Sequence, residues 1–225
     1  MNMKQFTSIS FILILALSSS AQDSGSSSFG LLAGANFQNL SGEDSEGKKL
    51  SNDMIVGFHA GLNYQIPIVP DFYIQPGVLF STKGAKYSDE NFSATTSLSY
   101  IEVPIEFLYK GALGSGSIII GLGPYFGYAI MGKTKFESDL LNEDSDIEFT
   151  NTIEADAEPK VYLKAFDAGG NIFAGYEMQS GLFFRLNTQL GMLNLQPENK
   201  KLEDSEETGI IKNTGFGVSL GYRFL

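Results

Sequence analysis

The chain has 225 residues and a formal net charge of −11, with 43% apolar, 12% aromatic and 18% charged residues. It has no Cys and one His, which excludes disulfide frameworks, thiolate metal sites and cysteine nucleophiles. The acidic balance has the wrong sign for binding a phosphate backbone, so nucleic acid is excluded as a partner. Its 25 Gly residues recur inside apolar stretches, which disfavours helices.

The first 21 residues have the pattern of a cleavable export signal. One basic residue, Lys4, precedes an apolar run at 11–17, and small residues stand at Ser19 and Ala21. This run is too short for a transmembrane helix, which needs about 20 residues. The pattern therefore predicts a signal peptide over 1–21.

The mature chain repeatedly shows strict alternation of apolar and polar or glycine residues, the period of a strand with two different faces. In the last segment Phe216, Val218, Leu220, Tyr222 and Phe224 alternate with Gly, Ser and Arg. Such a run cannot form an amphipathic helix. Eight segments of this kind predict eight strands, at 29–37, 57–66, 72–83, 98–110, 117–131, 164–177, 182–192 and 215–224.

The connections between these segments alternate between long and short. The long connections are 38–54, 84–97, 132–160 and 196–213, and the short ones are 67–71, 111–116 and 179–181. The long connections contain 20 acidic and 9 basic residues, which accounts for the whole net charge of the chain. An even number of antiparallel strands with short turns on one side and long loops on the other is the plan of an outer-membrane barrel.

We therefore predict an all-β, eight-stranded, antiparallel, up-and-down transmembrane β-barrel over 29–225, preceded by a Ser-rich segment at 22–28. The expected location is the outer membrane of a Gram-negative bacterium. The alternative is a soluble periplasmic lipocalin-like barrel with its apolar face inward. In that barrel Phe58, Leu62, Leu220 and Phe224 would line a cavity for an apolar ligand.

Two observations favour the apolar face pointing outward. Strands of about ten residues at a tilt of about 45° match the thickness of a bilayer. Aromatic residues also gather at the short-turn ends, as expected of a membrane-interface girdle. The residues predicted to form this girdle are Tyr64, Phe72, Tyr73, Tyr109, Tyr176, Tyr222 and Phe224.

The opposite face carries charges that a narrow barrel must pair with one another. We predict a structural ion-pair network in the lumen formed by Glu102, Glu106, Asp167, Arg185 and Arg223, with Lys83 as a further partner. Glu102 and Glu106 lie about 13 Å apart along one strand, which is too far for a proton-sharing pair of carboxylates.

Proline interrupts three of the proposed strands, at Pro76, Pro104 and Pro124. Proline donates no hydrogen bond to a β-ladder, and a closed barrel has no free edge to tolerate it. We therefore expect bulges or strand ends at these positions.

His59 is the single candidate for imidazole chemistry, and it lies on the polar face of the second segment. The sequence places no Ser or Asp beside it, so we expect a hydrogen-bonding role in the lumen. No catalytic residue is predicted, and the chain is not expected to be an enzyme.

One acidic run resembles the start of a calcium loop, with Asp144, Asp146 and Glu148 at alternate positions. The glycine position of such a loop holds Phe149 and its closing glutamate position holds Ala155, so an EF-hand is rejected. No metal or other cofactor is predicted. Loose divalent-ion binding by this loop or by 203–207 is the alternative to a plain solvated loop.

The chain resembles the PorT-like outer-membrane β-barrel family and, more loosely, the eight-stranded OmpA-type barrels. The residues that carry this resemblance occur in order along most of the mature chain: Gly34, Asn36, Phe37, Phe80, Ser81, Lys83, Gly84, Tyr100, Glu102, Val103, Pro104, Gly121, Gly123, Pro124, Tyr125, Gly175, Tyr176, Gly221, Tyr222, Arg223 and Phe224. The resemblance implies a fold and an outer-membrane location, and it implies no catalytic residue. It also implies a link of some members to protein secretion or gliding.

From the sequence we therefore expect a non-enzymatic outer-membrane barrel with a structural or partner-binding role. The resemblance to the PorT-like family implies that this role is associated with protein secretion. The partners are outer-membrane lipid and an envelope protein bound by the acidic loops, and the barrel is expected to be a monomer.

Overall fold

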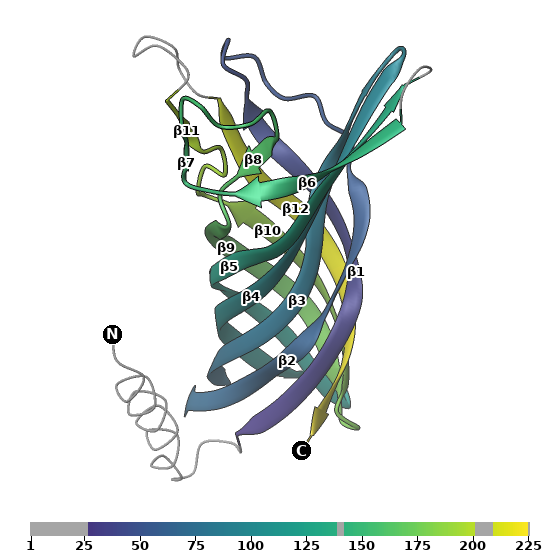
Figure 1. Cartoon of the computed structure of the whole chain (residues 1–225). Helices are drawn as coiled ribbons and strands as arrows, with labels where there is room; N and C mark the ends of the chain where they lie inside the picture. The colour runs from purple at the N-terminus through teal and green to yellow at the C-terminus, as the bar shows by residue number, and fades with distance from the viewer. Residues whose placement is uncertain (1–26, 139–141, 201–208, 225) are drawn as a thin grey trace, which may run out of the picture.

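The computed structural model describes residues 27–138, 142–200 and 209–224, almost entirely as β-structure. The signal peptide predicted at 1–21 and most of the Ser-rich segment lie outside these residues. Eight long strands form the wall of a barrel (Figure 1). They are β1 (Ser28–Glu43), β2 (Ile55–Val69), β3 (Phe72–Asp89), β4 (Phe92–Leu113), β5 (Gly116–Ser138), β9 (Phe166–Met178), β10 (Leu182–Gly191) and β12 (Ile210–Phe224).

The ring of strands is closed. Each wall strand pairs antiparallel with its two neighbours, and the pairing of β1 with β12 joins the first strand to the last. Phe29 faces Phe224 at one end of this pair, and Glu43 faces Ile210 at the other. The eight-stranded up-and-down barrel predicted from the alternation is therefore confirmed. Closure satisfies the edge hydrogen bonds that an open sheet would leave exposed in a membrane.

The short connections lie at one end of the barrel, close to the C-terminus (Figure 1). They include Asp71 between β2 and β3, Gly114 between β4 and β5, and Gly181 between β9 and β10. Gly181 has a φ of 87°, and a Cβ atom there would meet the carbonyl oxygen of Arg223. Only glycine fits this position without strain, so Gly181 allows the chain to reverse sharply between β9 and β10.

Two of the four predicted long loops are largely strand. β3 and β4 continue to a tight turn at 90–91, so the segment 84–97 is an extended hairpin. The segment 132–160 completes β5 and then forms β6 (Asn142–Phe149) and β7 (Thr152–Ile153). The alternation of apolar and polar residues breaks down in these segments, which is why the sequence predicts loops there. Strands above the membrane need no continuous lipid-facing apolar side, and their Thr and aromatic residues favour β-structure.

Two further short strands complete the end of the barrel with the long connections. β8 (Val161–Leu163) pairs with β6, and β11 (Glu198–Asn199) pairs with β7. The β6–β8 pairing lies within the β5–β9 connection, and the β7–β11 pairing joins that connection to the β10–β12 connection above the barrel mouth (Figure 1). No helix in the described part of the chain is long and apolar enough to cross a membrane.

The three prolines lie beside gaps in the ladder and not at bulges. Pairing between β2 and β3 lapses opposite Pro76, between β3 and β4 opposite Pro104, and between β4 and β5 opposite Pro124, each time without a register shift. The prediction of bulges or strand ends at these three prolines was therefore wrong. The bulges of the described strands fall elsewhere, between Pro67 and Val69 and opposite Ser99. Two consecutive residue pairs are missing at each gap, and the pairs before and after the gap keep the same register.

Apolar side chains inside the barrel form two separate groups. One lies toward the short turns and includes Leu32, Leu79, Leu108 and Phe183. The other closes the mouth beneath the long connections, where Tyr100, Ala129, Ile147, Leu163 and Leu195 pack together. Between and around these groups the interior is polar, so the candidate sites are the polar lumen and the loops above the mouth.

Candidate functional site

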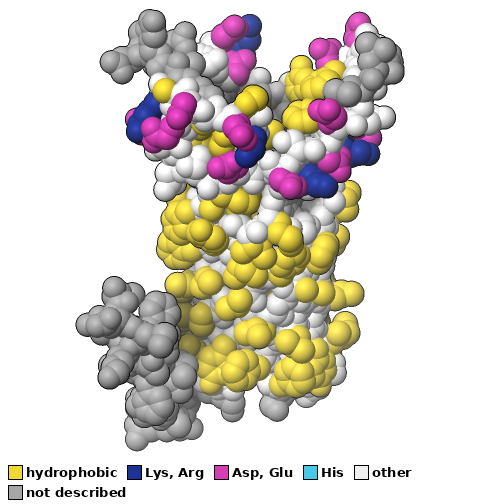
Figure 2. All heavy atoms as spheres, in the orientation of Figure 1, with side chains coloured by type: hydrophobic (Ala, Val, Ile, Leu, Met, Phe, Trp, Pro, Cys, Tyr) yellow, Lys and Arg dark blue, Asp and Glu magenta, His cyan; other side chains and the backbone are white. Residues whose placement is uncertain are grey.

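The outer wall of the barrel is apolar. Phe58 is 55% exposed, Leu62 45%, Leu220 65% and Phe224 52%, so the four residues that the soluble alternative would bury in a cavity face outward. On the face drawn in Figure 2, hydrophobic side chains cover much of the wall and charged side chains are concentrated above it. This distribution is that of a surface in contact with lipid, and it does not favour the soluble ligand carrier.

Most residues of the predicted girdle lie on this outer wall near the short turns. Tyr109, Tyr222 and Phe224 are exposed, and the rings of Tyr222 and Phe224 are 5.2 Å apart. Tyr64 packs against Phe29 with ring centroids 4.5 Å apart. The remaining outward-facing members of the predicted set are Phe72, which is 5.2 Å from the ring of Tyr109, and Tyr176, which donates a hydrogen bond to the carbonyl of Leu113.

Tyr73 is the exception. It packs against the interior group that contains Leu32 and Leu108. Successive residues of a strand point to opposite faces, so the outward position of Phe72 turns Tyr73 inward. The prediction that Tyr73 belongs to the girdle was therefore wrong, because residues were grouped by nearness to a turn and not by face.

A second group of aromatic residues, which was not predicted from the sequence, lies on the outer wall near the long connections. Phe37 and Phe216 stack with ring centroids 4.9 Å apart, Phe166 is 49% exposed and Tyr128 is 60% exposed. The alternation of residues along each strand already predicts that these side chains face outward. With the girdle at the short turns they mark the two limits of the apolar wall.

Inside the barrel, Lys83 lies at the centre of an upper cluster of charges. Its Nζ is 2.5 Å from Glu102 and 3.4 Å from Asp167, and all three side chains are almost fully buried. Asp167 also accepts hydrogen bonds from Tyr125 at 3.1 Å and Asn213 at 2.8 Å. The ammonium group of Lys83 is 4.4 Å from the centre of the Tyr125 ring, a cation–π distance.

Glu106 is the centre of a second cluster, lower in the barrel. It lies 3.3 Å from Arg185 and accepts hydrogen bonds from Asn171 at 2.5 Å and Gln75 at 2.6 Å. The guanidinium group of Arg185 stacks 4.7 Å from the centre of the Phe173 ring. Glu102 and Glu106 thus belong to different clusters, as their separation along β4 led us to expect.

A third cluster lies near the short turns. Arg223 is 3.6 Å from Glu177, donates to Asn63 at 2.6 Å and donates to Gln75 at 3.1 Å. Lys110 is 2.5 Å from the other oxygen of Glu177. Glu177 and Lys110 were not predicted as members of the network, because both stand near strand ends, where a charged residue is typical of a turn. The five predicted network residues therefore lie in three clusters, and none of these clusters contains all of them.

His59 occupies a hydrogen-bonded site between β1, β2 and β12. Its Nδ1 is 2.7 Å from Oδ1 of Asn36 and its Nε2 is 2.7 Å from Oγ of Ser219. Asn36 in turn donates to Ser81 at 3.0 Å. The order Ser–His–Asn is that of a nucleophilic triad. All of these side chains are buried, however, and the arrangement serves as a satisfied polar cluster in the wall of the lumen.

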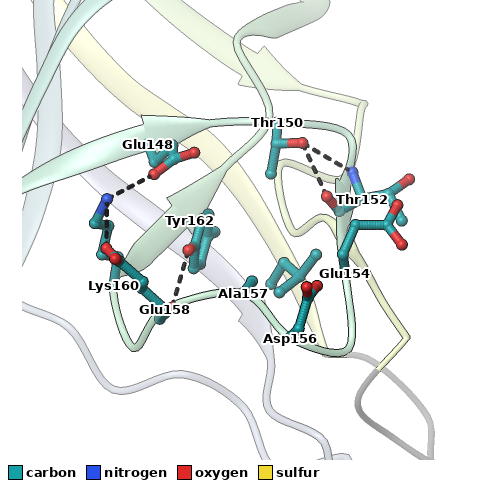
Figure 3. Close-up of a pocket in the computed structure, with 10 residues that line it drawn as sticks. Glu148, Thr150, Thr152, Glu154, Asp156, Ala157, Glu158, Lys160 and Tyr162 are labelled. Carbon is teal, nitrogen blue, oxygen red and sulfur yellow. Dashed lines mark hydrogen bonds and ion pairs between the residues drawn. The ribbon is translucent and has the colours of Figure 1, made fainter.

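Above the mouth, the chain from Glu148 to Tyr162 surrounds an open cavity of about 520 Å³ (Figure 3). Four carboxylates and one lysine are among the side chains that line it. Lys160 is 3.1 Å from Glu158 and 3.2 Å from Glu148. The hydrogen bond to Glu158, followed by the one to Glu148, raises the pKa of Lys160. The charged lining residues are Glu148, Glu154, Asp156, Glu158 and Lys160.

The acidic residues of this region are only partly neutralised. Glu154 is paired with Lys200 at 3.0 Å, whereas Asp156 forms no ion pair with any residue in the described ranges. The triplet Asp144, Asp146 and Glu148 lies on strand β6 and not in a loop, and Asp144 is bound by Lys133 at 3.0 Å. No group of metal-ligating side chains is found among the described residues, and the second acidic run at 203–207 lies outside them.

A family model described as "Outer membrane protein beta-barrel domain" matches residues 20–196 of this chain. The chain belongs to this outer-membrane β-barrel family. It is a protein of the Gram-negative outer membrane, with a wall of lipid-facing strands. A comparison with curated proteins gives no match.

The chain is also similar, at low identity, to solved outer-membrane proteins. The attachment invasion locus protein Ail of Yersinia pestis is 14% identical, with 88% of this chain and 99% of that chain covered and a TM-score of 0.37. Neisserial surface protein A is 12% identical, with coverages of 88% and 98% and a TM-score of 0.41. OprG of Pseudomonas aeruginosa is 11% identical, with coverages of 89% and 97% and a TM-score of 0.43.

Proposed function

We propose that this outer-membrane barrel is a non-enzymatic protein whose acidic outer loops bind a positively charged segment of an envelope partner. The observation that carries the proposal is the open cavity bounded by Glu148 and Tyr162, with four carboxylates and a single lysine in its lining. Its volume of about 520 Å³ lies in the range that small ligands and side-chain groups occupy.

The filled lumen supports a binding role over transport. The side chains of Lys83, Glu102, Glu106 and Arg223 are all about 1% exposed and lie in the three charged clusters described above. An eight-stranded barrel has an interior only wide enough for its own side chains. The role that we assign to these clusters is structural, since they hold the strands together across the lumen.

The ordered motif residues support a narrower assignment within the family. Tyr100, Glu102 and Pro104 on β4, and Gly123 and Pro124 on β5, occur in the order typical of PorT-like barrels. We place the chain in that branch as part of the proposal. A secretion-associated protein in the envelope is then the class of partner for the loops.

The proposal predicts that a basic peptide binds the full-length protein in neutral detergent micelles. A fluorescein-labelled pentalysine peptide is the probe, and fluorescence anisotropy is the measurement. The triple variant E154Q/D156Q/E158Q should bind it about tenfold more weakly, because each surface ion pair contributes roughly 0.2–1 kcal/mol.

The matched control removes the same number of charges from exposed positions outside the cavity. The variant E46Q/E90Q/E143Q should bind the peptide within about twofold of the unchanged protein. Equal weakening in both triple variants would show attraction by net charge alone and would contradict a specific site.

A second prediction separates the loop from the barrel. Deletion of 139–158 removes β6 and most of the cavity, and it leaves all eight wall strands and their pairing intact. The barrel should therefore stay folded, seen as compact mobility on a gel without boiling and slower mobility after boiling. Peptide binding should be lost. Loss of the compact form would mean that the loop carries the fold, because Ile147 of β6 packs in the mouth.

A further inference from the structure

A second cavity lies on the outside of the barrel, where β1 and β12 leave the apolar wall. It has a volume of about 390 Å³ and is bounded by both strands and by the connection that follows β1. Its lining combines two lysines, one hydroxyl group and two apolar side chains with one carboxylate. The side chains in this lining are those of Ser41, Glu43, Lys49, Leu50, Ile210 and Lys212.

The register of β1 with β12 fixes the height of this cavity. Phe37 faces Phe216 in the upper aromatic group, and Ser41 faces Lys212 four residues farther along. Four residues of a strand span about 13 Å, or about 9 Å along the membrane normal at a tilt of about 45°. Lys212 therefore stands just above the hydrocarbon layer, at the level of the lipid headgroups.

Lys212 also points to the lipid side of the wall. Its neighbour Asn213 is buried in the lumen, where it binds Asp167, and the alternation along β12 then turns Lys212 and Phe216 outward. The cavity is consequently open to the outer leaflet and not to the interior of the barrel.

The two lysines of this cavity have no carboxylate partner. Within the ranges that the structure describes, Lys49 and Lys212 have no ion pair, as is also true of Lys86 and Lys164, whereas five other surface lysines have one. The paired ones are Lys48 with Glu46, Lys133 with Asp144, Lys135 with Glu137, Lys160 with Glu148 and Glu158, and Lys200 with Glu154. With Glu43 included, the cavity carries a net charge of +1 in a protein of net charge −11.

We propose that this cavity binds the phosphate group of an outer-leaflet lipid. Lys49 and Lys212 supply the charge. The hydroxyl of Ser41 donates only a long hydrogen bond of 3.5 Å to the carbonyl of Lys212, and it would turn from that acceptor to donate to the phosphate. Leu50 and Ile210 offer apolar contact to the part of the lipid that enters the membrane. An anion at headgroup height, attached to an apolar body, matches this combination of side chains better than a free ion does.

The test uses the full-length protein in neutral detergent and native mass spectrometry to count bound lipid. The probes are a monophosphorylated lipid A and the same lipid after removal of its phosphate. The unchanged protein should retain the phosphorylated form at least tenfold better. The variant K49Q/K212Q should retain it about 30-fold less well, because each basic residue near a membrane surface contributes about fivefold and the two contributions multiply.

The control variant K133Q/K135Q removes the same charge from paired lysines and should retain the lipid within about twofold. Both variants are checked for folding by gel mobility with and without boiling, and the single variant K212Q should show an intermediate loss. Equal retention by K49Q/K212Q and the control would overturn the proposal. Displacement of the lipid by inorganic phosphate at the same concentration would also overturn it, since it would show a site for the free ion.

Discussion

Replacement of Lys83 by Met should lower the free energy of unfolding of the barrel by about 3–5 kcal/mol. The substitution removes the ammonium group that lies 2.5 Å from Glu102 and 3.4 Å from Asp167, and leaves two carboxylates buried without a cation. Buried charges without a partner are costly because the protein interior solvates them poorly. Urea-induced unfolding of the protein in lipid vesicles, followed by gel mobility, measures the change.

Two further variants test whether the unpaired charge is the cause. The triple variant K83M/E102Q/D167N removes the whole charged cluster and should recover most of the lost stability, since replacing a complete buried group of charges is often nearly neutral. The variant K133M breaks an exposed pair with Asp144 and should change the stability by less than about 1 kcal/mol. A loss in K133M as large as that in K83M would contradict the assignment.

Replacement of Leu220 by Arg should destabilise the protein in membranes by about 2–4 kcal/mol, the cost of a charge on the lipid face near the middle of the bilayer. Leu220 is 65% exposed and lies on β12 between Phe216, which belongs to the aromatic group near the long connections, and Tyr222, which belongs to the girdle near the short turns. Folding into vesicles at increasing urea concentration gives the magnitude.

Met192 provides the matched control. It is 68% exposed and directly follows β10 at the upper end of the wall, where water and headgroups solvate a charge. The variant M192R should therefore cost only about 0–1 kcal/mol. If L220R cost no more than M192R, Leu220 would not face hydrocarbon and the outward orientation of this face would be wrong.

Residue periodicity alone predicted the number of wall strands and the two faces of each strand, because a strand repeats every two residues whatever its neighbours are. Where predictions failed, the cause was local. Tyr73 was placed in the girdle by its nearness to a turn although its parity turns it inward. The hairpin ending at 90–91 was expected to be a loop because the alternation of apolar and polar residues breaks down along its strands.

The partners across the lumen could not be predicted in the same way. His59 binds Asn36, 23 residues away, and Ser219, 160 residues away, because all three lie around Gly34 in the register of β1 with β2 and β12. A Cβ atom at Gly34 would lie only 2.6 Å from the imidazole ring, so the site also depends on a missing side chain. Neither fact is visible in one strand alone.

The sequence by itself determined that the chain forms a membrane barrel with acidic outer loops, since alternation and the segregation of charge are properties of short stretches. The tertiary structure alone decided which charges meet in the lumen and which lysines of the described ranges have no ion pair. Those outcomes depend on the stagger between strands when the barrel closes, which brings together residues that are distant along the chain. The pairing of Arg223 with Glu177 and the adjacent positions of Lys49 and Lys212 in one cavity both result from that closure.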